Sequence, residues 1–173
     1  MADSVLVFVA VAADDPLAGP LLTELAVEYA TRYDSTPEAV SAWLRDYPAA
    51  EFEPPFGAMV IGLRDGVPVT GGAFRRFDAE TAELKRIWTD SGARRRGYAR
   101  ALLAELQARI VDAGYRRIYL TTGHRQPEAE ALYLAAGYQR MAEPLPAEGE
   151  VYPIAFVKDL AESGLSEPSA GYA

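Results

Sequence analysis

Residues 82–123 place a strand, a turn, a long amphipathic helix and a second strand in direct succession. The helix is expected over residues 97–113, where apolar side chains recur every three or four positions, and Gly114 ends it. A strand followed by a helix and another strand forms a right-handed crossover, so these two strands should be parallel. The segment therefore predicts a sheet with a helix packed on it.

The rest of the chain adds strands joined by short turns, which favour antiparallel pairing. Further strands are expected at 4–12, 58–63, 67–77, 138–143 and 152–160, and further helices at 16–32, 37–46 and 126–137. The sequence predicts one α/β (α+β) domain over residues 1–160. Its sheet is expected to be mixed, mostly antiparallel and twisted, with six to seven strands, a central parallel β-α-β unit and helices on both faces. Residues 161–173 are small and polar and are expected to form a flexible tail.

Two segments break the regular patterns. Residues 47–57 combine three prolines with two acids and three aromatic residues, which predicts a loop, either a cover over a site or a simple connector. Gly71–Gly72 lies inside a strand pattern and suggests a β-bulge.

Composition narrows the class of protein. The 173 residues carry a net charge of −8, which argues against a general nucleic-acid binder. The chain has no cysteine and one histidine, so a thiolate nucleophile is excluded and no metal site is expected. The apolar N-terminal stretch is short and reads as a buried strand, so neither a membrane span nor a signal peptide is expected. We expect a cytoplasmic protein.

Three arginines directly precede the helix at 97–113. The N-terminus of a helix carries partial positive charge, so Arg94, Arg95 and Arg96 are unfavourable there unless a multiply charged anion binds. A pyrophosphate would suit this position. Gly97 and Ala99 lack side-chain bulk where a backbone would contact phosphate oxygens. A solvated turn is the alternative explanation of the arginines.

Two common nucleotide motifs do not account for this turn. Residues 92–97 have the glycine spacing of a P-loop, but Tyr98 and Ala99 replace its lysine and its serine or threonine. No G-x-G-x-x-G fingerprint follows a strand. An ATP-binding or dinucleotide-binding α/β protein is therefore disfavoured.

The pattern Arg94-x-x-Gly97-x-Ala99, placed after a strand and opening a helix, resembles the coenzyme A signature of the GNAT acetyltransferase family, Q/R-x-x-G-x-G/A. The stretch "AELKRIWTDSGARRRGYARALLAEL" resembles the family's central strand, turn and helix, and "QPEAEALYLAAGY" resembles its last helix. With the element order, the resemblance covers residues 4–160. Arg95 departs from it, because many relatives have glycine there.

The resemblance implies a GNAT-like fold and the transfer of an acetyl group from acetyl-CoA to a primary amine, by direct attack in a ternary complex. The acceptor would be a small molecule or a peptide, and the family also includes homodimers. No metal cofactor, nucleic-acid partner or membrane partner is implied. The alternative is a GNAT-fold module that binds coenzyme A as a sensor or scaffold without turnover.

The resemblance implies two catalytic residues. Glu83 occupies a position where some relatives carry a catalytic base, although it could equally pair with Lys85 or Arg86 while an ordered water serves as the base. Tyr133 occupies the family's tyrosine position facing the leaving sulfur, where a phenol can donate a proton to a thiolate. A core aromatic is the alternative for Tyr133.

The resemblance also implies how the cofactor is held. The backbone of the strand end would bind the pantetheine arm, the amides that open the helix would bind the pyrophosphate with Arg94 and Arg96 adding charge, and a glutamine would contact the arm. The implied set is Ile87, Trp88, Thr89, Arg94, Arg95, Arg96, Gly97, Tyr98, Ala99 and Gln126. The Trp88 side chain itself is expected to serve packing.

Acceptor recognition is expected from residues 29–56 and the hairpin after Glu143. Glu51, Glu53 and the aromatic residues around them would form an acidic, aromatic mouth that favours a cation. A packed lid of core aromatics would explain the same composition.

Overall fold

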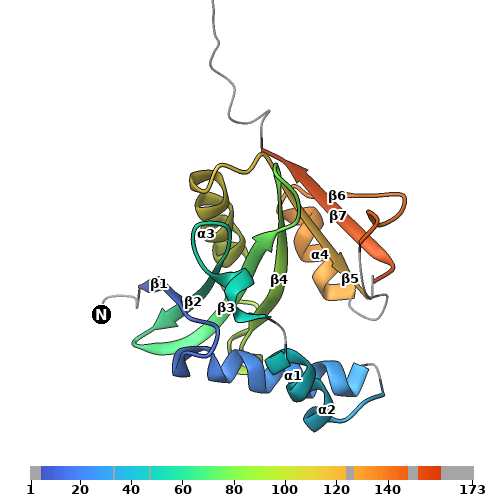
Figure 1. The fold of residues 1–173 in the computed structure, drawn as a ribbon. Coiled ribbons are helices and arrows are strands. Elements are labelled where there is room, and N and C mark those ends of the chain that lie inside the picture. Colours follow the sequence, from blue (N-terminus) through green and yellow to red (C-terminus); the bar gives the residue numbers. More distant parts are fainter. Residues whose placement is uncertain (1–4, 33, 47, 124–126, 148–151, 161–173) are drawn as a thin grey trace, which may run out of the picture.

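The computed structural model describes residues 5–32, 34–46, 48–123, 127–147 and 152–160 (Figure 1). Within these residues, seven strands form one sheet in the order β1-β2-β3-β4-β5-β7-β6. The strands are β1 (Leu6–Val11), β2 (Ala58–Arg64), β3 (Val67–Arg76), β4 (Thr81–Thr89), β5 (Arg117–Thr122), β6 (Gln139–Arg140) and β7 (Ile154–Asp159). Only β4 and β5 pair in parallel. The predicted fold class, a mixed sheet built around a parallel β-α-β unit, is confirmed.

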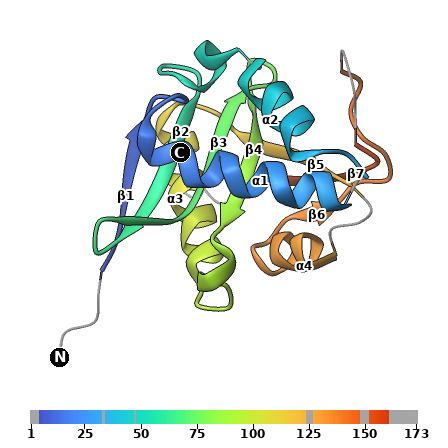
Figure 2. The same cartoon turned by 90° about the horizontal axis from the view of Figure 1, so that it is seen from below.

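Helices cover both faces of this sheet (Figures 1 and 2). The α-helices are α1 (Gly19–Arg32), α2 (Pro37–Asp46), α3 (Tyr98–Asp112) and α4 (Pro127–Ala135), and the short 3₁₀ turns are η1 (Pro16–Ala18), η2 (Ala49–Phe52) and η3 (Ser91–Ala93). One buried cluster joins α3 and α4 to the sheet and includes Leu84, Leu106, Ile118, Tyr133 and Phe156. The second joins α1, α2 and η2 to the opposite face and includes Leu21, Leu44, Phe52, Met59 and Trp88. The strand β4 thus sends side chains into two separate cores.

The first helical segment differs from the single helix expected over 16–32. Asp15 accepts a hydrogen bond from the Leu17 amide at 2.8 Å, as a helix cap should, but the first turn is 3₁₀ and the α-helix begins at Gly19. Pro20 has no N–H to donate to the carbonyl of Pro16, so an α-helical ladder cannot run through this turn.

The segment expected to be a loop over 47–57 contains the 3₁₀ turn η2. Phe52, at the end of this turn, is only 2% exposed and packs in the α1–α2 core. This tertiary contact helps to order a segment whose prolines exclude longer regular structure.

An irregularity lies where the glycine pair suggested a bulge. Between two paired positions, β3 contributes only Gly72 while β4 contributes Arg86 and Ile87, so the extra residue belongs to β4. Arg86 adopts φ = 59°, a left-handed conformation that is rare outside glycine. A Cβ at Gly72 would lie 2.6 Å from Ile87 Cδ1, so any larger residue opposite the bulge would displace the Ile87 side chain.

Candidate active site

The sheet splits between β4 and β5. The two strands pair only from Thr81 to Glu83 on β4 and from Arg117 to Tyr119 on β5, although both continue beyond these residues. On its other edge β5 remains paired with β7 along its whole length. The diverging halves therefore leave facing strand edges without a neighbouring strand, a position that an extended, amide-containing ligand can fill.

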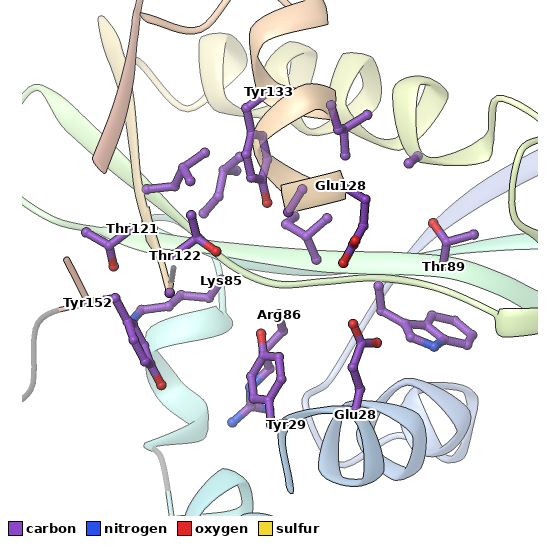
Figure 3. Close-up of a pocket in the computed structure, with 18 of the residues that line it drawn as sticks. Glu28, Tyr29, Lys85, Arg86, Thr89, Thr121, Thr122, Glu128, Tyr133 and Tyr152 are labelled. Carbon is purple, nitrogen blue, oxygen red and sulfur yellow. The ribbon is translucent and has the colours of Figure 1, made fainter. Parts of the chain in front are cut away.

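A pocket of about 650 Å³ occupies this split, a volume typical of small-molecule sites. α1 and α2 flank it on one side, and α4 and the start of α3 flank it on the other (Figure 3). Five cationic and three acidic side chains line it: Lys85, Arg86, Arg94, Arg95, Arg100, Glu28, Glu83 and Glu128. The pocket is thus locally basic in a chain whose net charge is −8.

The turn between β4 and α3 leaves backbone amides exposed at the pocket. Asp90 caps η3 by accepting from the Gly92 amide at 3.0 Å, but Gly97, the N-cap of α3, provides no side-chain cap. Arg95 and Gly97 both adopt left-handed conformations, with φ of 67° and 81°. Turns of this kind, followed by a helix N-terminus, present several N–H groups to one point and bind anions.

The three arginines of this turn differ in their contacts. The guanidinium of Arg94 donates to Glu28 on α1 at 3.1 Å and to the Thr89 carbonyl at 3.4 Å, so it links α1 to the turn. Arg95 lines the pocket, whereas Arg96 does not. The three arginines therefore have different surroundings. Arg94 cross-links α1 to the turn, Arg95 lines the pocket, and Arg96 lies outside it.

The strand end that leads into this turn also lines the pocket. Ile87, Trp88 and Thr89 all contribute to it. The Trp88 side chain is buried in the α1–α2 core and donates from its indole Nε1 to Glu24 at 3.0 Å, so it serves packing, as expected. Gln126, which the sequence also placed in the cofactor site, lies outside the described residues.

Glu83 lies at the point where the sheet splits. Its side chain is 7% exposed, and its carboxylate accepts from Arg75 Nε at 3.0 Å and lies 3.6 Å from Lys85 Nζ. Arg75 is directly opposite Glu83 in the β3–β4 register. The sequence proposed Lys85 or Arg86 as partners, and the cross-strand partner Arg75 was missed because it depends on the register.

Tyr133 projects from α4 with its hydroxyl directed into the pocket (Figure 3). Its ring packs against Tyr138 and Phe156, with centroids 5.8 and 5.7 Å away. Burial raises the pKa of the Tyr133 hydroxyl well above its ordinary value, so the group stays protonated at neutral pH. A protonated phenol facing a cavity is a hydrogen-bond and proton donor.

Thr122 is a pocket residue that the sequence did not indicate. It ends β5, is 6% exposed, and its Oγ1 has no hydrogen-bond partner among the described residues. Such buried groups are normally paired, and an unpaired one in a pocket points to a missing ligand. Its only signal in the sequence was its place at the carboxyl end of a strand in a β-α-β unit.

Comparisons with known proteins agree with this geometry. A sequence profile of the Acetyltransferase (GNAT) family matches residues 21–138. The chain belongs to this family. The human protein N-acetyltransferase 8 is 31% identical over 84 residues, which are 49% of this chain but only 36% of that protein. The chain therefore matches about a third of that relative's length.

Solved structures of the GNAT fold superpose on most of the chain. An acetyltransferase of Staphylococcus aureus Mu50 covers 90% of this chain and 99% of its own, with a TM-score of 0.73 and 15% identity. The PaiA N-acetyltransferase of Thermoplasma acidophilum, solved with coenzyme A, covers 90% of this chain and 99% of its own, with a TM-score of 0.69 and 12% identity. A GNAT acetyltransferase of Elizabethkingia anophelis, solved with acetyl-CoA bound, covers 90% of this chain and 98% of its own, with a TM-score of 0.60 and 17% identity. At these identities the likeness establishes the fold.

The described residues contain no cluster of histidine and acidic side chains that could hold a metal ion. None of their helices is long and apolar enough to cross a membrane.

Proposed function

We propose that this GNAT protein transfers an acetyl group from acetyl-CoA to a primary amine by direct attack within a ternary complex. The observation that carries this proposal is the split between β4 and β5, which ends at an uncapped helix N-terminus. Acetyl-CoA matches both features, because its amide-bearing arm can pair with the strand edges in the split and its diphosphate can bind the adjacent helix N-terminus.

The backbone contacts of β4 support the cofactor's placement. The Trp88 carbonyl accepts from Thr70 Oγ1 at 2.7 Å, and the Asp90 amide donates to the Val69 carbonyl at 2.8 Å, so both face β3. Because backbone groups alternate in direction along a strand, Ile87 and Thr89 face the split instead. We assign the pantetheine amides to these two residues, and the diphosphate to the amides from Arg95 to Ala99.

The proposed chemistry forms a bond from the amine nitrogen to the acetyl carbon and breaks the carbon–sulfur bond. The alkylammonium, with a pKa of about 10 for a lysine-like amine, first gives a proton to Glu83 or to a water that Glu83 orders. The departing thiolate takes a proton from the Tyr133 hydroxyl, and the second proton that the nitrogen loses as the amide forms returns to the Tyr133 oxygen. The raised pKa of Tyr133 keeps the proton available for this step.

Thr122 lies on the side of the split nearer Tyr133 (Figure 3). We assign its unpaired hydroxyl to a hydrogen bond with the acyl-thioester end of the cofactor. This contact would give Oγ1 the partner that it lacks among the described residues.

Incubation of the purified protein with acetyl-CoA and pooled amines tests the function. We expect free thiol to appear in step with an N-acetylated product, detected by mass spectrometry. Coenzyme A binding in a calorimeter without thiol release would instead support a sensor or scaffold. If neither thiol release nor coenzyme A binding is detected, both the proposed reaction and the proposed cofactor are refuted.

A further inference from the structure

Two adjacent cations of β4 lie on the same side of the sheet. In a regular strand Lys85 and Arg86 would point to opposite faces. The bulge changes this: Lys85 pairs with Glu83, whereas the Arg86 guanidinium donates to the Leu44 carbonyl on α2 at 2.6 Å and lies 5.0 Å from the Phe52 ring centroid. Both cations therefore face α1, α2 and η2, on the side where Tyr29 lies (Figure 3).

The conformation that produces this pairing is strained. Arg86 carries φ = 59° in the middle of a strand. Non-glycine residues keep such a conformation only where the surroundings enforce it, and these positions gather at functional sites. Both side chains also line the pocket in the split. The strain thus places a second positive charge beside the first one at a ligand cavity.

The acids that the sequence suggested for a cation-binding mouth lie elsewhere. Glu51 is bound by Arg75 at 2.9 Å, and Glu53 lines a separate depression with Phe56 and Arg76. Of the described acids lining the pocket from α1 and β4, Glu28 is bound by Arg94 at 3.1 Å and Glu83 lies between Arg75 and Lys85. This side of the pocket therefore favours an acceptor that carries an anionic group beside its amine over one that carries a second ammonium group.

We infer that the acceptor is an amine that carries a carboxylate close to its nitrogen, as in an amino acid, and that Lys85 and Arg86 bind the carboxylate. This inference rests on the proposed acetyl transfer. The adjacent Glu83 carboxylate would attract the acceptor's ammonium before its proton is lost. One acidic residue, Glu83, and two basic residues, Lys85 and Arg86, therefore match the two charges of a zwitterion. The rings of Tyr29, Trp43 and Tyr152 line the same pocket and suit an apolar or aromatic substituent.

The test compares phenylalanine with phenylalaninamide as acceptors, which differ in the charged group, and measures kcat/KM for each. The ratio of the two values is compared among the wild type, Lys85→Met and Arg86→Met, which cancels the intrinsic reactivity of each amine. Arg109→Met removes a cation that pairs with Glu105 on α3 outside the pocket, and serves as the control.

We expect each pocket variant to lower the ratio of the kcat/KM for phenylalanine to that for phenylalaninamide by about ten- to a hundredfold relative to the wild type, as for loss of a charge-assisted hydrogen bond. The control variant should leave the ratio unchanged. Arg86→Lys should recover part of the preference, because it restores the charge without the planar fork.

A ratio of the two kcat/KM values that neither pocket variant lowers would overturn the inference while leaving acetyl transfer intact. If no amine is acetylated, the proposed transfer fails. The carboxylate site is then judged by calorimetry, with N-acetylphenylalanine and its amide titrated into protein saturated with coenzyme A. Equal affinities for the two would overturn the site as well.

Discussion

At the scale of single residues, the pocket contains two hydroxyls that stability alone does not explain. Tyr133 and Thr122 are both buried and both line the split between the strands, and the Thr122 hydroxyl has no hydrogen-bond partner among the described residues. Burial of an unpaired polar group costs free energy. Their placement is therefore best explained by a ligand that pairs with them.

The first prediction concerns Tyr133. Tyr133→Phe should lower kcat about a hundredfold, the usual scale of a lost general acid, while the KM for acetyl-CoA stays nearly constant. Tyr138→Phe is the matched control, because Tyr138 belongs to the same buried aromatic cluster but does not line the pocket. Equal effects of the two variants on kcat would contradict the role.

Thr122 gives a prediction in which stability and activity change in opposite directions. Thr122→Val replaces a buried, unpaired hydroxyl with a methyl group of the same shape, so we expect the free energy of unfolding to rise by about 1 kcal/mol. The rate of acetyl transfer should fall about tenfold, and Thr122→Ser should restore it. Denaturant titration and thiol release measure the two effects. A stabilised variant with full activity would make the hydroxyl dispensable.

At the scale of elements, local patterns located most of the fold, and register-dependent features escaped them. The periodicity of 97–113 and its final glycine predicted α3 because a helix is specified by neighbours in sequence. The left-handed Arg86 and the Arg75–Glu83 ion pair depend on how β3 aligns with β4, which one strand cannot reveal. The 3₁₀ turn η2 was not predicted, although a packed lid of core aromatics was one of the two explanations offered for this segment, and Phe52 does pack in the α1–α2 core.

The next prediction compares the two ends of α3. Gly97 and Gly114 flank the helix, both have positive φ, and a Cβ on either would meet no atom within 4 Å. Changing either to Ala should cost about 1–2 kcal/mol of stability, from the left-handed conformation alone. Only Gly97→Ala should also weaken coenzyme A binding in calorimetry, because only Gly97 shapes the proposed phosphate turn. Equal affinities in the two variants would contradict that turn's role.

At the scale of the whole molecule, two buried tyrosines make stability depend on alkaline pH. Burial raises the pKa values of Tyr133 and Tyr138 in the folded state, whereas in the unfolded chain both ionise near pH 10. Above that pH the unfolded state loses protons that the folded state retains. The resulting stabilisation is complete below pH 10 and declines as pH rises toward the folded pKa values.

The expected loss approaches about 1.4 kcal/mol per pH unit for each tyrosine once the unfolded chain is ionised. Urea titrations of the wild type at pH 8, 10 and 11 should show this decline. The double variant Tyr133→Phe with Tyr138→Phe should show a shallower one, although Tyr115 and Tyr119, whose pKa values burial also raises, still contribute. Identical slopes would contradict the buried, protonated state of the pair.

The split in the sheet also bears on self-association. Strand edges without neighbours are templates onto which other chains add by backbone hydrogen bonding, and proteins protect them with charge, bulges or covering elements. Here the facing edges of β4 and β5 lie in the middle of the sheet, between helices and behind a bulge, so that a second copy of the chain cannot reach them as it could reach an outer strand such as β1. A narrow ligand can enter where a neighbouring protein cannot, so these inner edges bind a ligand without serving as a template for another chain.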